Sequence, residues 1–69
     1  MKASEVVAEI LRRGGRKLRQ KGSHARYECA CGTNKTTVPI HPGELGRGLL
    51  GAIEKDLEPC FGKRWLLGK

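Results

Sequence analysis

The chain has 69 residues and a formal net charge of +7, and only 4% of its residues are aromatic. A domain of this length buries only about 60% of the surface that its unfolded chain exposes, so its core is thin and leaves little room for a deep enclosed pocket. Chemistry would then take place on an open face, which suits a polymer better than a small metabolite. The positive charge indicates a nucleic acid or another polyanion as partner, although an acidic protein would satisfy the same charge.

The positive charge is concentrated in one part of the chain. Half of the 14 Lys and Arg residues lie within positions 12–26, where there is no Asp or Glu. These residues are Arg12, Arg13, Arg16, Lys17, Arg19, Lys21 and Arg26. A surface that is merely solvated usually mixes both signs of charge, so this pattern favours the binding of a polyanion.

The first predicted element is a helix with Ser4 as its N-cap. Glu5 in the first turn and Arg12 and Arg13 in the last turn have the signs that the helix dipole favours. Apolar residues at spacings of three and four form one stripe, which consists of Ala3, Val6, Val7, Ile10 and Leu11. Gly14-Gly15 is expected to end the helix, because glycine commonly follows a final turn.

Two predicted strands follow, joined by a turn at Gly22-Ser23. Residues 16–21 form a weak strand, in which only Leu18 is clearly apolar. The next run alternates, with Ala25, Tyr27 and Cys29 on one face and His24, Arg26 and Glu28 on the other. If the apolar set faces the helices, His24 lies on the solvent side of the sheet.

A second turn and a third strand complete the predicted sheet. Residues 31–34 have the composition of a hairpin turn, and residues 35–40 form the third strand. Thr36, Val38 and Ile40 share one of its faces. Pro39 cannot donate to a strand ladder, so it is expected near a strand end or on a sheet edge.

The second predicted helix lies in the last third of the chain. Residues 41–44 are expected to begin a helical region whose regular part starts near Gly48, because each of the early glycines costs roughly 1 kcal/mol against alanine. Its apolar stripe consists of Leu45, Leu49, Ile53 and Leu57, widened by Leu50 and Ala52. Pro59 and Gly62 are expected to end it. The tail, residues 61–69, carries Trp65, Leu66 and Leu67, which either cap the core or dock a partner.

The order of these elements predicts an α+β fold of α-β-β-β-α type. Both helices pack on one face of a three-stranded antiparallel sheet, which is also the order of double-stranded-RNA-binding domains. No repeat or linker divides the chain, so residues 1–69 are expected to form a single domain. No apolar run is long enough for a signal peptide or a membrane span, which predicts a cytoplasmic protein with reduced thiols.

Three cysteines are an odd number, so they cannot all pair within one chain. Cys29, Cys31 and Cys60 give the pattern C-x-C…C, which lacks the paired C-x-x-C spacing typical of zinc sites. Residues two apart in a strand share a face, so Cys29 and Cys31 are expected to be small core residues. The sequence therefore predicts no metal site.

His24 follows the turn at the end of the cationic run and is the candidate for proton transfer. Imidazole has an ordinary pKa of about 6.5, which suits proton transfer near neutral pH. RNA can be cut without a metal when a base takes the proton of the 2′-hydroxyl, which then attacks the adjacent phosphorus. Arg19, Lys21 and Arg26 are expected to stabilise charge on the phosphate oxygens. His41 precedes a proline at the start of a helical region and is expected to be structural.

Three segments of the chain resemble the HicA family of toxin messenger-RNA interferases. They are Arg19-Gln20-Lys21-Gly22-Ser23-His24, Val38-Pro39-Ile40-His41-Pro42, and Glu44-Leu45 followed by Gly48-Leu49. The resemblance covers about residues 4–58 in the family's order and spacing. It implies a fold like that of a double-stranded-RNA-binding domain, ribosome-independent RNA cleavage that inhibits translation and growth, and a HicB-like antitoxin as partner.

Carried over by position, the resemblance implies that His24 is the catalytic residue of an endoribonuclease acting on single-stranded messenger RNA. The residues expected to bind the RNA are Lys17, Arg19, Lys21, Gly22, Ser23 and Arg26. No small-molecule cofactor, metal or membrane is implied. The chain departs from the family at Arg16, where an aromatic residue is usual. It also departs at Leu49, where a threonine usually opens the second helix.

Two other classes of function stay open. A non-catalytic module of the double-stranded-RNA-binding type would share the fold, but such domains resemble one another in a lysine cluster at the start of the second helix. This chain has only Arg47 there, among glycines and leucines. A structural subunit whose basic surface binds an acidic antitoxin is the third class, and cleavage of RNA by the free protein would separate it from a toxin.

Overall fold

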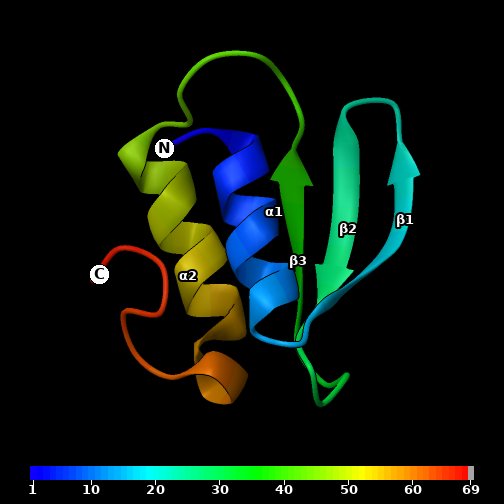
Figure 1. Ribbon diagram of the computed structural model, residues 1–69. Helices are drawn as coiled ribbons and strands as arrows, with labels where there is room; N and C mark the ends of the chain where they lie inside the picture. Colours follow the sequence, from blue (N-terminus) through cyan, green and yellow to red (C-terminus); the bar gives the residue numbers. More distant parts are fainter. Residues whose placement is uncertain (69) are drawn as a thin grey trace.

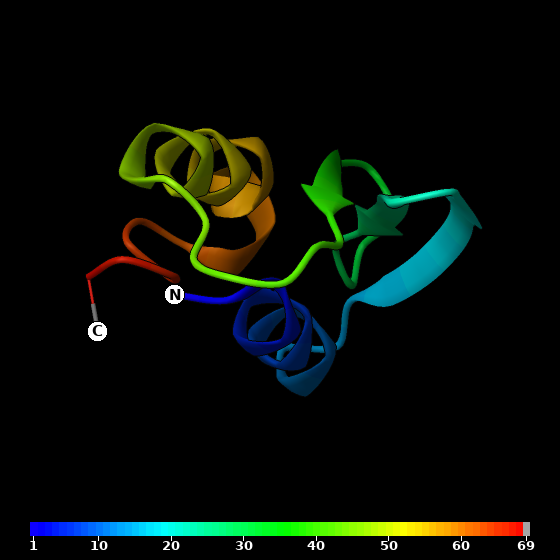
Figure 2. The same cartoon turned by 90° about the horizontal axis from the view of Figure 1, so that it is seen from above.

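The computed structural model describes residues 1–68, and its elements follow the predicted order. The elements are α1 (Ala3–Arg12), β1 (Arg16–Lys21), β2 (His24–Glu28), β3 (Lys35–Pro39) and α2 (Arg47–Phe61). The strands form one antiparallel sheet in the order β1-β2-β3, and both helices lie on the same side of it (Figures 1 and 2). The predicted α+β fold is confirmed, and it is compatible with that of double-stranded-RNA-binding domains.

The start of α1 differs from the prediction, because Lys2 and not Ser4 is the N-cap residue. The backbone N–H of Lys2 donates to Glu5 Oε1 at 2.7 Å. Lys2 also pairs with Glu44 in an isolated antiparallel bridge, and the N–H of Leu45 donates to the Met1 carbonyl at 2.9 Å. These long-range contacts fix the backbone before Ala3, so the helix begins earlier than the capping pattern suggests.

The end of α1 agrees with the prediction, and Gly15 has a specific reason to be glycine. A Cβ atom at this position would lie 2.6 Å from Ile10 Cγ2 and 2.8 Å from the Glu28 carbonyl oxygen. The chain therefore passes between α1 and the end of β2 at a distance that no side chain would allow. Gly14 before it has a φ of +89°, which is the left-handed conformation that glycine adopts without strain.

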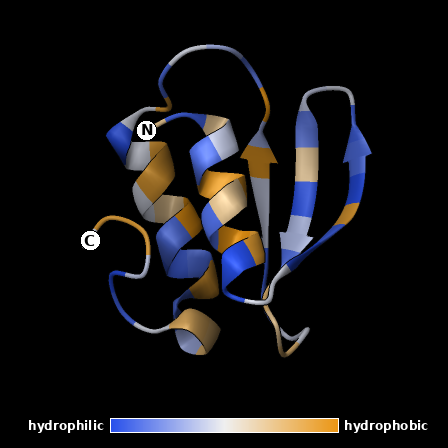
Figure 3. Ribbon diagram, viewed as in Figure 1, coloured by the Kyte–Doolittle hydropathy of each residue, from blue (hydrophilic) through white to orange (hydrophobic). Residues whose placement is uncertain are grey.

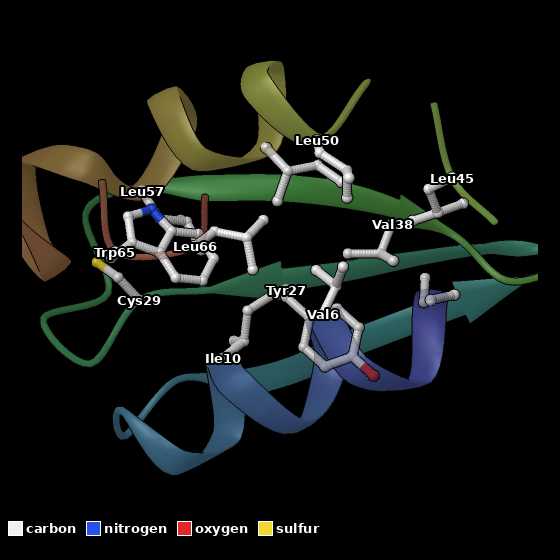
Figure 4. Packing of buried hydrophobic residues seen from close by; sticks show 13 residues of the cluster. Val6, Ile10, Tyr27, Cys29, Val38, Leu45, Leu50, Leu57, Trp65 and Leu66 are labelled. Carbon is white, nitrogen blue, oxygen red and sulfur yellow. The ribbon is translucent and has the colours of Figure 1, made fainter. Parts of the chain in front are cut away.

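The core lies between the two helices and the helix-facing side of β2 and β3 (Figure 4). Apolar residues concentrate there, whereas β1 is almost entirely hydrophilic (Figure 3). The alternation predicted for β2 is confirmed, since Ala25, Tyr27 and Cys29 are buried. The other buried apolar residues are Ala3, Val6, Ile10, Val38, Leu45, Leu50, Ile53, Leu57, Trp65 and Leu66. Leu11, predicted for the apolar stripe of α1, is 51% exposed.

Helix α2 begins at Arg47, one residue before the predicted start, and it ends at Phe61, directly before the predicted terminator Gly62, whereas Pro59 does not end it. Residues 41–44 are not helical, and Pro59 lies inside the last turn of the helix. A proline lacks the N–H for one intrahelical bond, and the last turn is completed after it by the N–H of Gly62, which donates to the Glu58 carbonyl at 2.8 Å. Gly62, with a φ of +95°, is therefore the residue that ends the helix.

The tail after α2 caps the core. The indole N–H of Trp65 donates to the Glu54 carbonyl at 2.7 Å, and the backbone N–H groups of Leu66 and Leu67 donate to Glu54 Oε2 at 3.1 and 2.5 Å. The rings of Phe61 and Trp65 meet edge to face with centroids 5.1 Å apart. Of the two roles expected for the tail, the structure thus shows the first. Within residues 1–68, no helix is long and apolar enough to cross a membrane.

Candidate functional site

The hairpin of β1 and β2 positions His24. Its turn contains Gly22, whose φ of +59° is left-handed, and the Gln20 side chain donates to the Gly22 carbonyl at 3.0 Å. The Ser23 carbonyl accepts from the N–H of Ile40 at 2.5 Å, which ties the turn to the end of β3. His24 therefore begins β2 at a fixed place, with Lys21 opposite it on β1 and Pro39 opposite it on β3.

The strand register shows which side chains share the side of the sheet away from the helices. Residues directly opposite each other on antiparallel strands point to the same face. Arg19, Arg26 and Thr37 form one such row, next to the row of Lys21, His24 and Pro39. Arg16, Glu28 and Lys35 form a third row. Because Ala25 and Tyr27 between these rows are buried against the helices, the three rows point away from them. We call this surface the open face.

Of the predicted RNA-binding residues, Arg19, Lys21 and Arg26 lie on the open face with His24, and Gly22 and Ser23 form the turn beside it. Lys17 does not lie there. The register between β1 and β2 shifts at Leu18, so Lys17 is opposite Tyr27, on the helix-facing side of the sheet, and its Nζ donates to Gln20 Oε1 at 2.6 Å. A one-residue irregularity of this kind turns the side chains before it to the other face.

Two other cations of the basic run do not reach the open face either. Arg12 and Arg13, at the end of α1, both form ion pairs with the carboxylate of the buried Glu9. The guanidinium of Arg13 also donates to the Trp65 carbonyl at 3.2 Å. The basic run of the sequence is thus divided between a helix end and the sheet.

His24 and the cations beside it differ in the hydrogen bonds that their side chains make. The His24 side chain is exposed and makes no hydrogen bond or ion pair within the described part of the chain. Arg26 Nη1 donates to Thr37 Oγ1 at 2.8 Å, which fixes its guanidinium over the sheet. All of β1 is exposed. The surface around His24 is therefore open to a long, flexible polyanion.

Arg16 and Lys35 are open-face residues that the sequence reasoning missed as site residues. Arg16 pairs with Glu28, which is opposite it in the register, and Lys35 lies on the other side of Glu28. The alternation of the third strand contained the signal for Lys35, because Thr36 and Val38 face the core. For Arg16 the irregularity at Leu18 hid the signal. In a regular strand in which Arg19 and Lys21 point to the open face, Arg16 would point toward the helices.

His41 lies in the loop between β3 and α2. Its Nδ1 is 2.9 Å from the Pro42 carbonyl oxygen, so Nδ1 carries the proton and donates it. This local contact agrees with the structural role expected for His41, and it leaves Nε2 facing solvent on an exposed ring. A shallow hollow on the surface, lined by Met1, Leu45, Arg47, Leu50, Leu66 and Leu67, lies on the helix side and not on the open face.

The expectation that Cys29 and Cys31 share a strand face is wrong. Strand β2 ends at Glu28, and a turn follows in which the N–H of Gly32 donates to the Cys29 carbonyl at 2.9 Å. The turn folds the exposed Cys31 back, so that its sulfur lies 3.0 Å from that of the buried Cys29 and 2.8 Å from that of Cys60 at the end of α2. The three sulfur atoms all lie within 4.8 Å of one another.

The thiols of this cluster affect one another's ionisation. Burial opposes the ionisation of Cys29, but hydrogen bonds from the side chains of Cys31 and Cys60 and from the backbone of Asn34 outweigh it and lower the pKa to about 5. The hydrogen bonds that Cys60 makes to Cys31 and Cys29 raise its pKa to about 11. The cluster therefore favours a single anionic sulfur that is stabilised by two thiols.

Comparison with known proteins gives one match. The family model for the HicA toxin of bacterial toxin–antitoxin systems matches residues 3–58. No curated protein and no solved structure matches the chain. The matched region contains both helices except for the last turn of α2, all three strands and the whole of the open face, and it leaves out Cys60 and the tail.

Proposed function

Because the chain belongs to the HicA family of toxins of bacterial toxin–antitoxin systems, we propose that it is a metal-independent endoribonuclease that cleaves single-stranded messenger RNA. His24 is the catalytic residue in this proposal. The single observation that carries it is that exposed His24 lies opposite Lys21 on the open face, with Arg19 and Arg26 in the neighbouring row. An imidazole among cations is an arrangement that can cleave a phosphodiester without a metal, because it supplies a base and stabilises charge on the phosphate oxygens.

The reaction needs little from the protein. The imidazole of His24 takes the proton of a ribose 2′-hydroxyl, and the 2′-oxygen attacks the adjacent phosphorus. The bond from phosphorus to the 5′-oxygen breaks, and the departing oxygen takes a proton from solvent. The products are a 2′,3′-cyclic phosphate and a 5′-hydroxyl end. One positioned base contributes typically 10²–10⁴-fold, so the enzyme is a modest catalyst.

The cations supply binding and electrostatic support. Lys21 is closest to His24 in the register, and the Arg26 guanidinium is held in place by Thr37. Both can donate to the non-bridging phosphate oxygens, on which negative charge increases in the transition state. Arg19 extends this charge along β1, which is exposed over its whole length and can follow an RNA backbone.

The open face also supports the second part of the proposal, a HicB-like antitoxin that binds the toxin. An acidic protein that covered Arg19, Lys21 and Arg26 would neutralise the cations and exclude RNA from His24 in one step. The toxin alone is expected to arrest growth, because loss of messenger RNA blocks translation. Co-expression with the antitoxin is expected to restore growth.

The test is cleavage of a long single-stranded RNA by the purified protein, with and without EDTA, beside the variants His24→Ala and His41→Ala. Wild type and His41→Ala are expected to cut and to leave cyclic phosphate ends, whereas His24→Ala loses at least about 100-fold in rate. His41→Ala is the matched control, since it removes the other exposed histidine. Growth arrest on induction is measured with each form.

Other outcomes would contradict the proposal or change the roles of its residues. Equal cleavage by wild type and His24→Ala would show that another residue or a contaminating nuclease is responsible. Binding of duplex RNA without cleavage by any form would favour the double-stranded-RNA-binding module, and Arg47→Ala would then be expected to weaken that binding. Loss of cleavage in both histidine variants would make His41 a second catalytic group.

A further inference from the structure

We propose that Cys29, Cys31 and Cys60 bind one zinc ion, which joins the turn between β2 and β3 to the end of α2. The three sulfur atoms come from two distant segments, and nothing in the cleavage mechanism uses them. They lie within 4.8 Å of one another, close enough for one ion to contact all three. Thiolate sulfur is the ligand type that Zn²⁺ binds in its most stable protein sites.

The geometry is close to that of a zinc site. Three sulfurs bound to one zinc ion at about 2.3 Å lie about 3.8 Å apart. The separations in the structure are 3.0 Å from Cys29 to Cys31 and 2.8 Å from Cys31 to Cys60. Each has to lengthen by about 1 Å or slightly less, which a rotation of the exposed Cys31 side chain can provide. A disulfide would use only two of the sulfurs and leave the third without a role.

The packing of α2 against β3 places Cys60 next to the other two cysteines. Thr36 on β3 donates to Asp56 on α2 at 2.8 Å. Cys60 is four residues after Asp56, so it lies on the same helix face one turn further on. β3 leads back from Thr36 to the turn that holds Cys31. The helix and the strand thus bring Cys60 to the turn independently of any bond between sulfurs.

The fourth coordination position would be open to solvent. Zn²⁺ takes four ligands in most sites, and Thr33 Oγ1, which lies 3.2 Å from the Cys31 sulfur, is a weak ligand for zinc. Cys31 and Thr33 are exposed, so water can complete the coordination. When the ion binds, the thiols that are still protonated release their protons to solvent.

The bound zinc ion would stabilise a small domain. Chains below roughly 70–80 residues often need a disulfide or a metal in addition to their core. The ion would close the end of the core that Trp65 and Phe61 cover, next to Cys60. It lies far from the proposed catalytic residue, since His24 begins β2 and Cys29 follows its end, about 16 Å away along the strand. The proposal therefore does not depend on the ribonuclease proposal.

The experiment is titration of the reduced, metal-free protein with Co²⁺, a spectroscopic substitute for zinc, followed by displacement with Zn²⁺. Charge-transfer absorption from sulfur to cobalt at one equivalent, lost when zinc is added, is the expected result. Cys31→Ser and Cys60→Ser are expected to lower the affinity by at least about 100-fold. Cys31 is exposed, so its variant can be expected to fold, which is checked by circular dichroism.

Thr33→Ala is the matched control, because it changes the same turn without removing a sulfur. It is expected to bind metal like the wild type. A hundredfold excess of Zn²⁺ over the dissociation constant is expected to raise Tm by roughly 10–20 °C in the wild type and in Thr33→Ala, and not in Cys31→Ser. Emission of Trp65, the single tryptophan of the chain, provides a second signal of binding.

Three results would overturn the proposal. The reduced protein could fail to bind Co²⁺ and Zn²⁺ at all, or Cys31→Ser could bind as tightly as the wild type. Mild oxidation could also yield a Cys31–Cys60 disulfide, seen as a mass loss of two hydrogens, in a protein whose reduced form has no metal affinity. That last result would assign the cluster to redox chemistry instead.

Discussion

The two ends of β2 carry opposite kinds of chemistry. At its first residue, the histidine end, His24 is exposed among Lys21, Arg19 and Arg26, and its side chain has no partner within residues 1–68. Just past its last residue, the sulfur end, Cys29 is buried and in contact with sulfurs from two other segments. The strand thus leads from an exposed imidazole at one end to a buried thiol just past the other. Because the two ends share no side-chain contact among the described interactions, we expect that each can be changed without the other.

The sharpest test at the sulfur end is Trp65→Ala, which should have the largest effect on stability. Trp65 is 2% exposed and packs against Phe61, and its indole donates to Glu54. Truncation of a buried tryptophan typically costs 3–5 kcal/mol, a large part of the free energy of unfolding of a domain this small. Urea unfolding measures the loss. A loss below about 1 kcal/mol would mean that the tail is not part of the core.

At the histidine end, His24→Ala is expected to lower the activity and to leave the stability unchanged. The rate of RNA cleavage falls at least about 100-fold, equal to about 2.7 kcal/mol in the barrier, whereas Tm stays unchanged. The reason is that the exposed imidazole makes no hydrogen bond or ion pair within residues 1–68 that truncation would remove. Thermal unfolding and cleavage are measured on the same preparation. A clear drop in Tm would show that His24 has a structural role as well.

Glu54→Ala tests whether the Glu54 carboxylate holds the tail against α2 at the sulfur end. Its carboxylate accepts from the backbone N–H groups of Leu66 and Leu67, and Leu66 is buried. A buried N–H that loses its acceptor costs about 1–3 kcal/mol, so unfolding should become easier by that amount. Glu54→Gln, which keeps a carbonyl acceptor, is the matched control and should lose less. Equal losses in both variants would show that the negative charge, not the acceptor, holds the tail.

The cations of the open face should affect RNA affinity by smaller, additive steps. Arg19→Ala and Arg26→Ala are each expected to weaken binding several-fold and to lower the salt dependence by about 0.7 for each lost phosphate contact. Binding is measured with His24→Ala as background, at several salt concentrations. Lys17→Ala, from the other face of the same strand, should change the slope less. An equal change would place the RNA across the edge of β1 and not on the open face.

The smallest expected effect concerns the N-terminus of the chain, which lies at neither end of β2. The terminal ammonium group of Met1 pairs with Glu44 and lowers the pKa of that carboxyl group. A carboxyl group whose pKa is lower in the folded state stabilises the fold above its ordinary pKa of about 4.5, and this contribution is lost as the pH falls below it. Between pH 6 and pH 3, Tm should therefore fall slightly more in the wild type than in Glu44→Gln. Parallel curves would show that the pair contributes nothing.

The sequence by itself determined the elements and the histidine end. The period of the apolar residues identified both helices and the helix-facing side of β2, and Gly14-Gly15 and Gly22-Ser23 marked where the chain turns. These signals are local, because they depend on the spacing of neighbours and on backbone conformations that glycine favours. The segment from Arg19 to His24 is one hairpin strand and its turn, so its residues remain neighbours in the fold.

Only the tertiary structure decided the features that depend on contacts between distant segments. The shift at Leu18 that turns Lys17 away, the start of α1 at a bridge to Glu44, and the capping of the core by Trp65 all belong to this group. The meeting of Cys29, Cys31 and Cys60 is the clearest case. The spacing of these cysteines matches no familiar pattern, because a turn brings Cys31 back and a helix register supplies Cys60. The turn is closed locally by the bond from Gly32 to the Cys29 carbonyl, but the position of Cys60 is set by how α2 packs on the sheet, which the order of residues does not reveal.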